Sequence, residues 1–172
     1  DKVCVNSITR ENITFVTEAA SMFGCQCITV SIDVKQVNGS YRVYDYLQHE
    51  PVAGPLLDWL KVVEAAGAGE ILLNSVNRDG AKIGYDSELL KLVSDTVQIP
   101  VIALGGVGRF DQLAEGVIKG GCQAVAAANI FQHVEHSTIT AKAQMREAGL
   151  NVRLSSEVKY ESFNLDFLGR PY

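Results

Sequence analysis

The chain has 172 residues, 47% of them hydrophobic and 20% charged, and its 15 Lys and Arg against 20 Asp and Glu give a net charge of −5. This composition suits one globular domain, excludes disordered and collagen-like classes, and argues against a nucleic-acid partner because the basic residues are few and scattered. No apolar run approaches the ~18 residues of a membrane span and no secretory signal is present at the start, so we expect a cytoplasmic protein without membrane contact.

Short apolar runs alternate with segments of helical spacing along the chain. Each run is almost continuously apolar, which is typical of parallel strands covered on both faces. The predicted strands are residues 3–6, 28–33, 71–76, 101–104 and 124–130. The predicted helices lie in segments 13–23, 56–63, 89–97 and 113–118. This order predicts a repeated βα unit with right-handed crossovers.

Two α/β architectures compete for this pattern. A doubly wound sheet needs a G-x-G-x-x-G fingerprint after its first strand, and here glycines follow the fourth strand instead, at Gly105 and Gly106. A (β/α)8 barrel places phosphate sites in the loops after its last two strands. We therefore predict a fold of the (β/α)8 TIM-barrel type.

Segment 37–50 interrupts the repeat. It contains Asn38-Gly39 between aromatic and β-branched residues, which predicts a β-hairpin inserted after the second visible strand. At the other end, helical spacing is lost but aromatic residues persist. We thus expect a partial barrel over residues 1–154 and an extended tail over 155–172.

Polar side chains follow two of the predicted strands. Asp33 ends the run 28–33, so its carboxylate should lie at the mouth of the barrel and serve proton transfer, although a salt bridge to Lys35 is the plainer alternative. In the stretch 74–80, Asp79 is a second candidate for proton transfer or hydroxyl binding, while Asn77 can only hydrogen-bond. Ordinary turn chemistry explains that stretch equally well.

Small residues end the last two predicted strands. Glycines let a phosphate approach the backbone, and the N–H groups of the following turn can bind it. The candidate phosphate-binding residues here are Gly105, Gly106, Ala128 and Asn129. The His and Cys spacings match no metal site, and we expect neither a metal nor a cofactor.

Taken together, the motifs resemble a known family. DKVCVN, SIDVK, GAGEILLNSVNRDG, GYD, IPVIALGGVG, AAANIF and AGLNVRL occur in the order and spacing of HisF, the cyclase subunit of imidazole glycerol phosphate synthase. The similarity covers residues 1 to about 154 and corresponds to strands 4 to 8 of that barrel, with the hairpin after strand 5. It implies a lyase-type cyclase that receives ammonia from a HisH-like glutamine amidotransferase and combines it with a phosphorylated substrate.

The resemblance also assigns roles to single residues. It implies that Asp33 is the acid/base aspartate of strand 5 and that Asp79 either contacts the substrate diol or supports the residues that do, whereas the aspartate of the family's first strand has no counterpart. The other implied roles are one phosphate site (Asn6, Ser7), a second one (Gly105, Gly106, Ala128, Asn129), substrate contacts (Lys35, Asn74, Asn77) and an ammonia gate (Lys2, Glu70).

Four positions depart from the family pattern and favour a different ligand. They are Asn74 and Asn77 in place of Thr and Asp, and Leu104 and Asn129 in place of Ser. These changes resemble HisF-like paralogues of surface-polysaccharide gene clusters, which are associated with glycosyl amidation. Our first hypothesis is therefore an ammonia-handling subunit for glycosyl amidation; the alternatives are the histidine-pathway cyclase and a truncated, non-catalytic barrel.

The predicted sheet also leaves open edges. Five parallel strands cannot close a barrel, so the outer strands would expose unpaired N–H and C=O groups. We expect these edges to be covered by further βα units upstream or by self-association of two chains.

Overall fold

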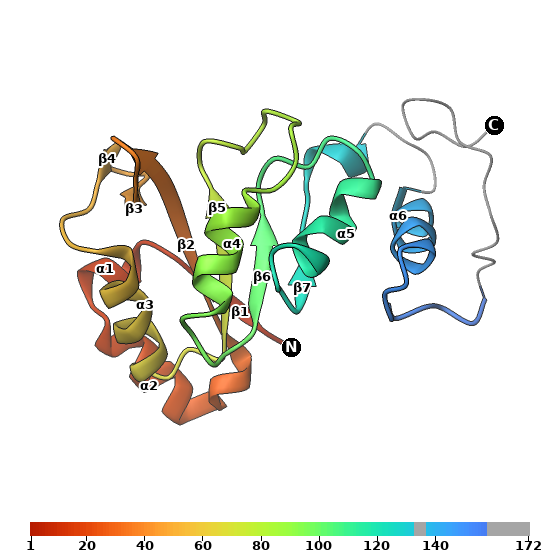
Figure 1. Ribbon diagram of the computed structural model, residues 1–172. Helices are drawn as coiled ribbons and strands as arrows, with labels where there is room; N and C mark the ends of the chain where they lie inside the picture. The colour runs from red at the N-terminus through yellow and green to blue at the C-terminus, as the bar shows by residue number, and fades with distance from the viewer. Residues whose placement is uncertain (133–136, 158–172) are drawn as a thin grey trace.

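The computed structural model describes residues 1–132 and 137–157, which contain one mixed sheet with helices packed on it (Figure 1). Strands β1, β2, β5, β6 and β7 are parallel neighbours in that order, which confirms the predicted parallel sheet. The strands are β1 (Val3–Val5), β2 (Ile28–Val37), β3 (Ser40–Asp45), β4 (Glu50–Pro51), β5 (Glu70–Ser75), β6 (Val101–Leu104) and β7 (Ala124–Val125).

The helices occupy the segments between strands. They are α1 (Ile8–Glu11), α2 (Thr14–Phe23), α3 (Leu56–Ala65), α4 (Ser87–Ser94), α5 (Asp111–Ile118) and α6 (Ser137–Glu147), with 3-10 turns at Cys25–Cys27 and Asn129–Gln132. Helix α4 begins after Asp86, whose carboxylate accepts the N–H of Leu89, as expected for an N-cap. Helix α2 ends at Gly24, which takes a positive φ of 87° that few other residues tolerate.

The last predicted strand is much shorter than expected. Of residues 124–130, only Ala124–Val125 pair with β6, and the chain then enters the 3-10 turn at Asn129–Gln132. This stretch is rich in alanine, which has little preference for a strand, so its apolar character alone did not establish its conformation.

The two faces of the parallel sheet differ, contrary to the expectation that both are covered. In β2, Ile28, Val30, Ile32 and Val34 are buried beneath helices. Beyond Thr29, the alternating side chains of the other face, such as Asp33, are only partly buried. Because side chains alternate along a strand, the polar residues of β2 share the face that the helices leave open.

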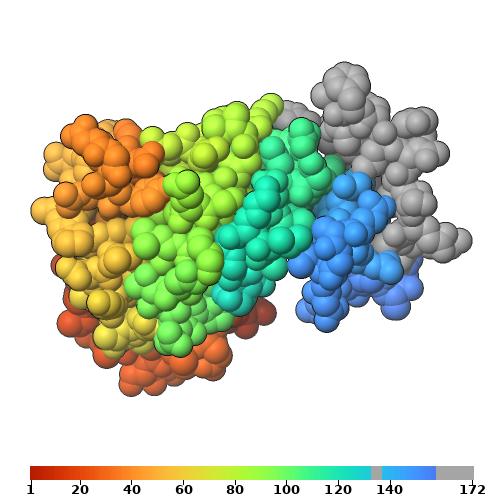
Figure 2. Space-filling view, in the orientation of Figure 1, coloured from red at the N-terminus to blue at the C-terminus, as the bar shows by residue number. Residues whose placement is uncertain are grey.

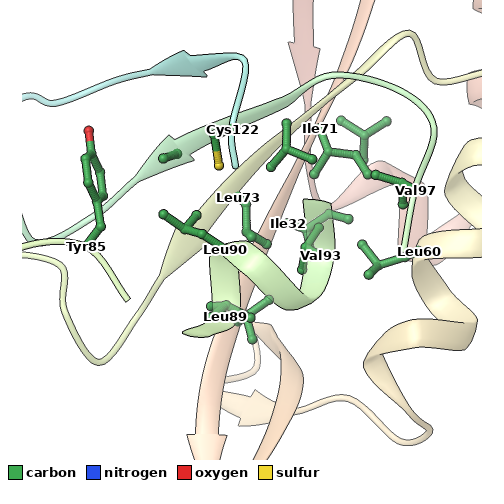
Figure 3. Packing of buried hydrophobic residues seen from close by; sticks show 14 of the residues in the cluster. Ile32, Leu60, Ile71, Leu73, Tyr85, Leu89, Leu90, Val93, Val97 and Cys122 are labelled. Carbon is green, nitrogen blue, oxygen red and sulfur yellow. The ribbon is translucent and has the colours of Figure 1, made fainter. Parts of the chain in front are cut away.

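The core lies between the sheet and the covering helices. Ile71 and Leu73 of β5 meet Leu89, Leu90 and Val93 of α4, as Figure 3 shows. Each of these side chains is at most 2% exposed, so removing one would leave a cavity in a close-packed layer. This layer fixes β5 and thereby the residues at its carboxyl end.

Strand β2 continues past the parallel sheet into an antiparallel ladder with β3. Val37 pairs with Ser40, and the two residues between them, Asn38 and Gly39, have φ values of 48° and 79°. Two positive φ values in a two-residue loop are those of a type I′ hairpin turn. The ladder therefore turns the chain back, so that β3 runs antiparallel along the carboxyl-terminal half of β2.

The outer surface is formed by α3, α4 and α5 in sequence, with α6 beside α5 (Figure 2). Among the described residues, β1 pairs only with β2 and β7 pairs only with β6, so the sheet does not close into a barrel. Most of the predicted tail over residues 155–172 lies outside the described residues, which end at residue 157.

Candidate functional site

Asp33 stands at the carboxyl end of the sheet, between side chains from both neighbouring strands. Its Oδ2 accepts a hydrogen bond from Asn6 Nδ2 at 2.8 Å, and its Oδ1 accepts one from Asn74 Nδ2 at 2.9 Å. The register places Asp33 directly opposite Asn74 on β5, while Asn6 follows the end of β1. Each oxygen thus has a neutral donor, and the two hydrogen bonds together fix the plane of the carboxylate.

The paired glycines lie on the same side as Asp33. A Cβ atom on Gly105, whose φ is 95°, would lie 2.7 Å from Asn74 Oδ1 and 3.0 Å from the carbonyl oxygen of Ser75. Only the Asn74 amide therefore separates the backbone of Gly105 from the Asp33 carboxylate. Asn74 Oδ1 is buried and has no hydrogen-bond partner in the described part of the chain.

A pocket opens beside these glycines and brings together most of the predicted phosphate-binding set. The loop after β5 lies over it, because the N–H of Gly84 donates to the carbonyl of Gly106 at 2.8 Å. The lining residues are Asp79, Gly80, Lys82, Leu104, Gly105, Gly106, Val107, Ala127, Ala128 and Asn129. Small residues and backbone N–H groups around a concave surface suit an anion.

Lys82 is a pocket residue that the motif reasoning did not include. It has a positive φ of 59°, and its Cβ lies 2.6 Å from the position that a Cβ on Gly108 would occupy. The close approach of these two backbones brings a cation to the glycine-lined pocket. The local sequence carried one signal, a lysine three residues after Asp79, but only the folded loop shows its proximity to Gly105 and Gly106.

Lys35 and Asn77 lie on the hairpin side of the rim. Among the described residues, the alternative ion pair between Lys35 and Asp33 is not formed; instead Lys35 Nζ lies 4.8 Å from the centroid of the Tyr44 ring. Asn77 Oδ1 accepts the backbone N–H of Gln36 at 2.7 Å. The Asn77 oxygen therefore ties the loop after β5 to the end of β2.

Asn6 and Ser7 are separated from the glycine pocket by β2 and β5. They follow β1, whereas Gly105 and Gly106 follow β6, and Ser7 Oγ accepts a hydrogen bond from Arg10 at 3.3 Å. The two groups of predicted phosphate ligands thus lie on opposite sides of Asp33, which would suit a ligand with a phosphate at each end.

The opposite end of the sheet carries a different carboxylate. Glu70, at the start of β5, forms an ion pair with Lys2 and accepts a hydrogen bond from Thr29 Oγ1 at 3.1 Å. The Lys2 side chain is 48% exposed. The two residues predicted to form an ammonia gate therefore do lie together, at the amino ends of the strands.

Within residues 1–132 and 137–157, no three His, Cys, Asp or Glu side chains are arranged to hold a metal ion. The helices in the same ranges are too short or too polar to cross a bilayer.

The chain matches the sequence profile of a family described as histidine biosynthesis protein, over residues 1–137. It belongs to that family, as a HisF member. It is 64% identical over all 172 residues to a Vibrio vulnificus (strain YJ016) protein provisionally named imidazole glycerol phosphate synthase subunit hisF2. It is also 44% identical over 154 residues, or 90% of the chain, to the imidazole glycerol phosphate synthase subunit HisF of Chlorobaculum parvum (strain DSM 263 / NCIMB 8327).

These relatives are longer than the chain. The aligned part of this HisF member spans 63% of the Vibrio protein and 61% of the Chlorobaculum protein. The parallel sheet with its alternating helices fits part of a (β/α) barrel.

Proposed function

We propose that this chain supplies strands 4 to 8 of a (β/α)8 barrel that acts as the cyclase subunit of imidazole glycerol phosphate synthase. The supporting observation is the position of Asp33: both of its oxygens are held by amides at the rim, and the glycine pocket lies one side chain away. The names of the HisF relatives point to the same reaction.

In this proposal Asp33 is the acid/base group. The Asp33 carboxylate accepts a proton as ammonia adds to the phosphorylated substrate, and it returns that proton to the departing nitrogen when a carbon–nitrogen bond of the substrate breaks. Asn6 and Asn74 keep the carboxylate in one orientation throughout. Because the donors are neutral, they position Asp33 without cancelling its charge.

The pocket and the side opposite it would hold the two phosphates. Gly105 and Gly106 line the pocket together with Lys82, Ala128 and Asn129, and the lysine would supply a positive charge to a bound phosphate. Asn6 and Ser7 would take the second phosphate. Asp79 would accept hydrogen bonds from the substrate diol, with Lys35, Asn74 and Asn77 as further substrate contacts.

The remaining parts of the active site would come from elsewhere. The aspartate that the HisF family carries on its first strand has no counterpart in this chain, so further βα units or a second copy of the chain would supply it. The same addition would pair the free edges of β1 and β7. Self-association across these edges is our proposal for the isolated chain.

Ammonia would enter at the amino ends of the strands. Lys2 and Glu70 lie there as an ion pair, and we assign the docking of a HisH-like glutamine amidotransferase to that end. Passage from there to Asp33 follows the partly buried face of β2.

The cyclase replaces glycosyl amidation as our preferred function. The preference for a sugar acceptor depended on four substituted positions, whereas both HisF relatives named above carry imidazole glycerol phosphate synthase names. One of the four, Asn74, has a structural role here, since its amide donates to Asp33. Leu104 lines the pocket and remains the substitution that most favours a different ligand.

The proposal is tested by turnover of the intact protein with ammonia and the phosphoribosyl-formimino substrate. Asp33→Asn removes the proton acceptor, and we expect it to lower kcat by roughly 10²- to 10⁴-fold. The matched control is Asp95→Asn, because Asp95 is 60% exposed and forms an ion pair with Lys91 on α4, away from the rim. Equal rates for Asp33→Asn and Asp95→Asn would refute the acid/base role of Asp33.

A further inference from the structure

The amide of Asn6 can face Asp33 in two ways, and only one of them is favourable. With Nδ2 toward the carboxylate, as observed, Asn6 donates a hydrogen bond at 2.8 Å. A half-turn of the amide would place Oδ1 against the carboxylate, and two acceptors repel each other. Whatever fixes the orientation of the Asn6 amide therefore also fixes one of the two supports of Asp33.

Arg10 makes that contact. Its Nη1 donates to Asn6 Oδ1 at 2.9 Å, so a turned amide would bring its own NH2 group against a guanidinium that has no acceptor. Arg10 lies on α1, one helical turn after Asn6, and its side chain is only 11% exposed. Burial holds the guanidinium in place and strengthens the hydrogen bond to Asn6.

Arg10 is in turn held by the hairpin. Its Nε donates to Asp45 Oδ2 at 3.2 Å, and its Nη2 lies 3.1 Å from Asp45 Oδ1. Asp45 is the last residue of β3, and its Oδ1 also accepts the N–H groups of Leu47 at 2.8 Å and Gln48 at 3.1 Å. The N–H of Gln48, then that of Leu47 and the guanidinium of Arg10, lower the pKa of the Asp45 carboxyl.

We propose that Arg10 is a positioning residue for Asp33, acting through the Asn6 amide, and that Asp45 links this control to the turn at the end of β3. The inference rests on the proposed function, because it treats Asp33 as the acid/base group. The continuous path is Asp45, Arg10, Asn6, Asp33, with every step a hydrogen bond of 3.2 Å or less.

Along this path, the neutral amide of Asn6 separates the guanidinium of Arg10 from the carboxylate of Asp33. A guanidinium in direct contact with Asp33 would stabilise its ionised form and weaken it as a base. With Asn6 between them, Arg10 orients the donor while its own charge is balanced by Asp45. The arrangement thus gives Asp33 a fixed geometry and leaves its negative charge available to the reaction.

A simpler explanation is that Arg10 and Asp45 only attach the hairpin to α1. Arg42 offers a matched control, because it lies on β3, the strand that ends at Asp45. Its guanidinium donates to the carbonyl of Gly54 at 2.9 Å and so attaches the hairpin at another point. Arg42→Met would loosen the hairpin without touching Asn6. Arg10→Met removes a guanidinium of the same kind and keeps most of the apolar stem.

The experiment measures Asn6 directly, by NMR exchange of its side-chain NH2 protons with solvent in the intact protein. We expect Arg10→Met to speed that exchange by about 10-fold, because the amide then rotates away from Asp33, while Arg42→Met leaves it unchanged. Equal exchange rates in the two variants would overturn the inference.

Turnover gives the second readout. We expect Arg10→Met to lower kcat by about 10-fold, since it misplaces a group used in the reaction step, and to raise KM as well, because Arg10 also contacts Ser7 of the proposed phosphate site. Arg10→Lys should restore only part of kcat, because an ammonium cannot contact Asn6 and Asp45 in the same fork. Fast exchange in Arg10→Met together with an inactive wild-type protein would reject the proposed function alone and leave the positioning of Asn6 intact.

Discussion

The two ends of the parallel sheet each carry a carboxylate, and the two carboxylates have different hydrogen-bond partners. At the carboxyl end, Asp33 is held by two neutral amides, and the nearest guanidinium contact reaches it only through Asn6. At the amino end, Glu70 is paired directly with Lys2. Glu70 is therefore bound directly to a cation, whereas Asp33 is oriented by neutral donors.

The two ends also differ in how tightly their side chains are packed. The rim is crowded: Gly105 has no room for a side chain, and Asn74 Oδ1 is buried against it. The amino end is open, since Lys2 is about half exposed there. Strict geometry is therefore concentrated where the proposed chemistry takes place, and changes at the rim should cost more than changes at the amino end.

The largest effect on stability is expected at Gly105. In Gly105→Ala the residue must keep a φ of 95°, and its Cβ would lie 2.7 Å from Asn74 Oδ1. We expect the free energy of unfolding in urea to fall by about 2 to 4 kcal/mol, from backbone strain and steric overlap together. The control is Gly149→Ala, which has a φ of 83° but open space around it and should cost only about 1 kcal/mol.

A loss for Gly105→Ala no greater than that for Gly149→Ala would show that the rim is not crowded. It would also remove the argument that Asn74 and Gly105 fix each other. The same comparison sharpens the position of Asp33, because any shift of Asn74 is passed to the carboxylate by their shared hydrogen bond.

The hairpin is attached to the rim through a group that titrates at high pH. Burial, then the hydrogen bond from Tyr41 to Asp86 at 3.0 Å, raise the pKa of Tyr41 to about 12. A raised pKa means that the folded state retains the phenolic proton longer than the unfolded state. The Tyr41–Asp86 hydrogen bond therefore contributes fully to the free energy of unfolding below pH 10. This contribution is lost as the pH rises toward about 12.

We expect Tyr41→Phe to reduce the fall in stability between pH 10 and about 12, and to cost about 1 kcal/mol at neutral pH through the lost hydrogen bond. Thermal melts across this pH range measure both effects. Tyr46→Phe is the control, because Tyr46 is 67% exposed on the same hairpin. If Tyr46→Phe changed the slope as much as Tyr41→Phe does, the attachment through Asp86 would not be responsible.

The sequence predicted the position of Asp33 at the rim, but not the side chains that hold it there. A run of buried residues ending in Asp33 determines where that carboxylate lies, because the carboxyl ends of parallel strands meet at one edge. The supports depend on contacts between distant positions: Arg10 meets Asp45, 35 residues later, and no local pattern specifies such a pair. The short β7 was missed for a related reason, since apolar alanines at residues 124–130 fit either a strand or a turn.

The smallest effect is expected at the amino end. Lys2→Met removes the ion pair with Glu70, but a half-exposed pair in water contributes little, so we expect a loss of less than about 1 kcal/mol in the free energy of unfolding. Glu70 keeps its hydrogen bond from Thr29, and added salt should weaken the wild type toward the variant because salt screens the pair. A loss above about 2 kcal/mol that persists in high salt would mean that the amino end is as constrained as the rim. The contrast between an open amino end and a crowded rim would then no longer hold, and Lys2 would have to be regarded as part of the folded core.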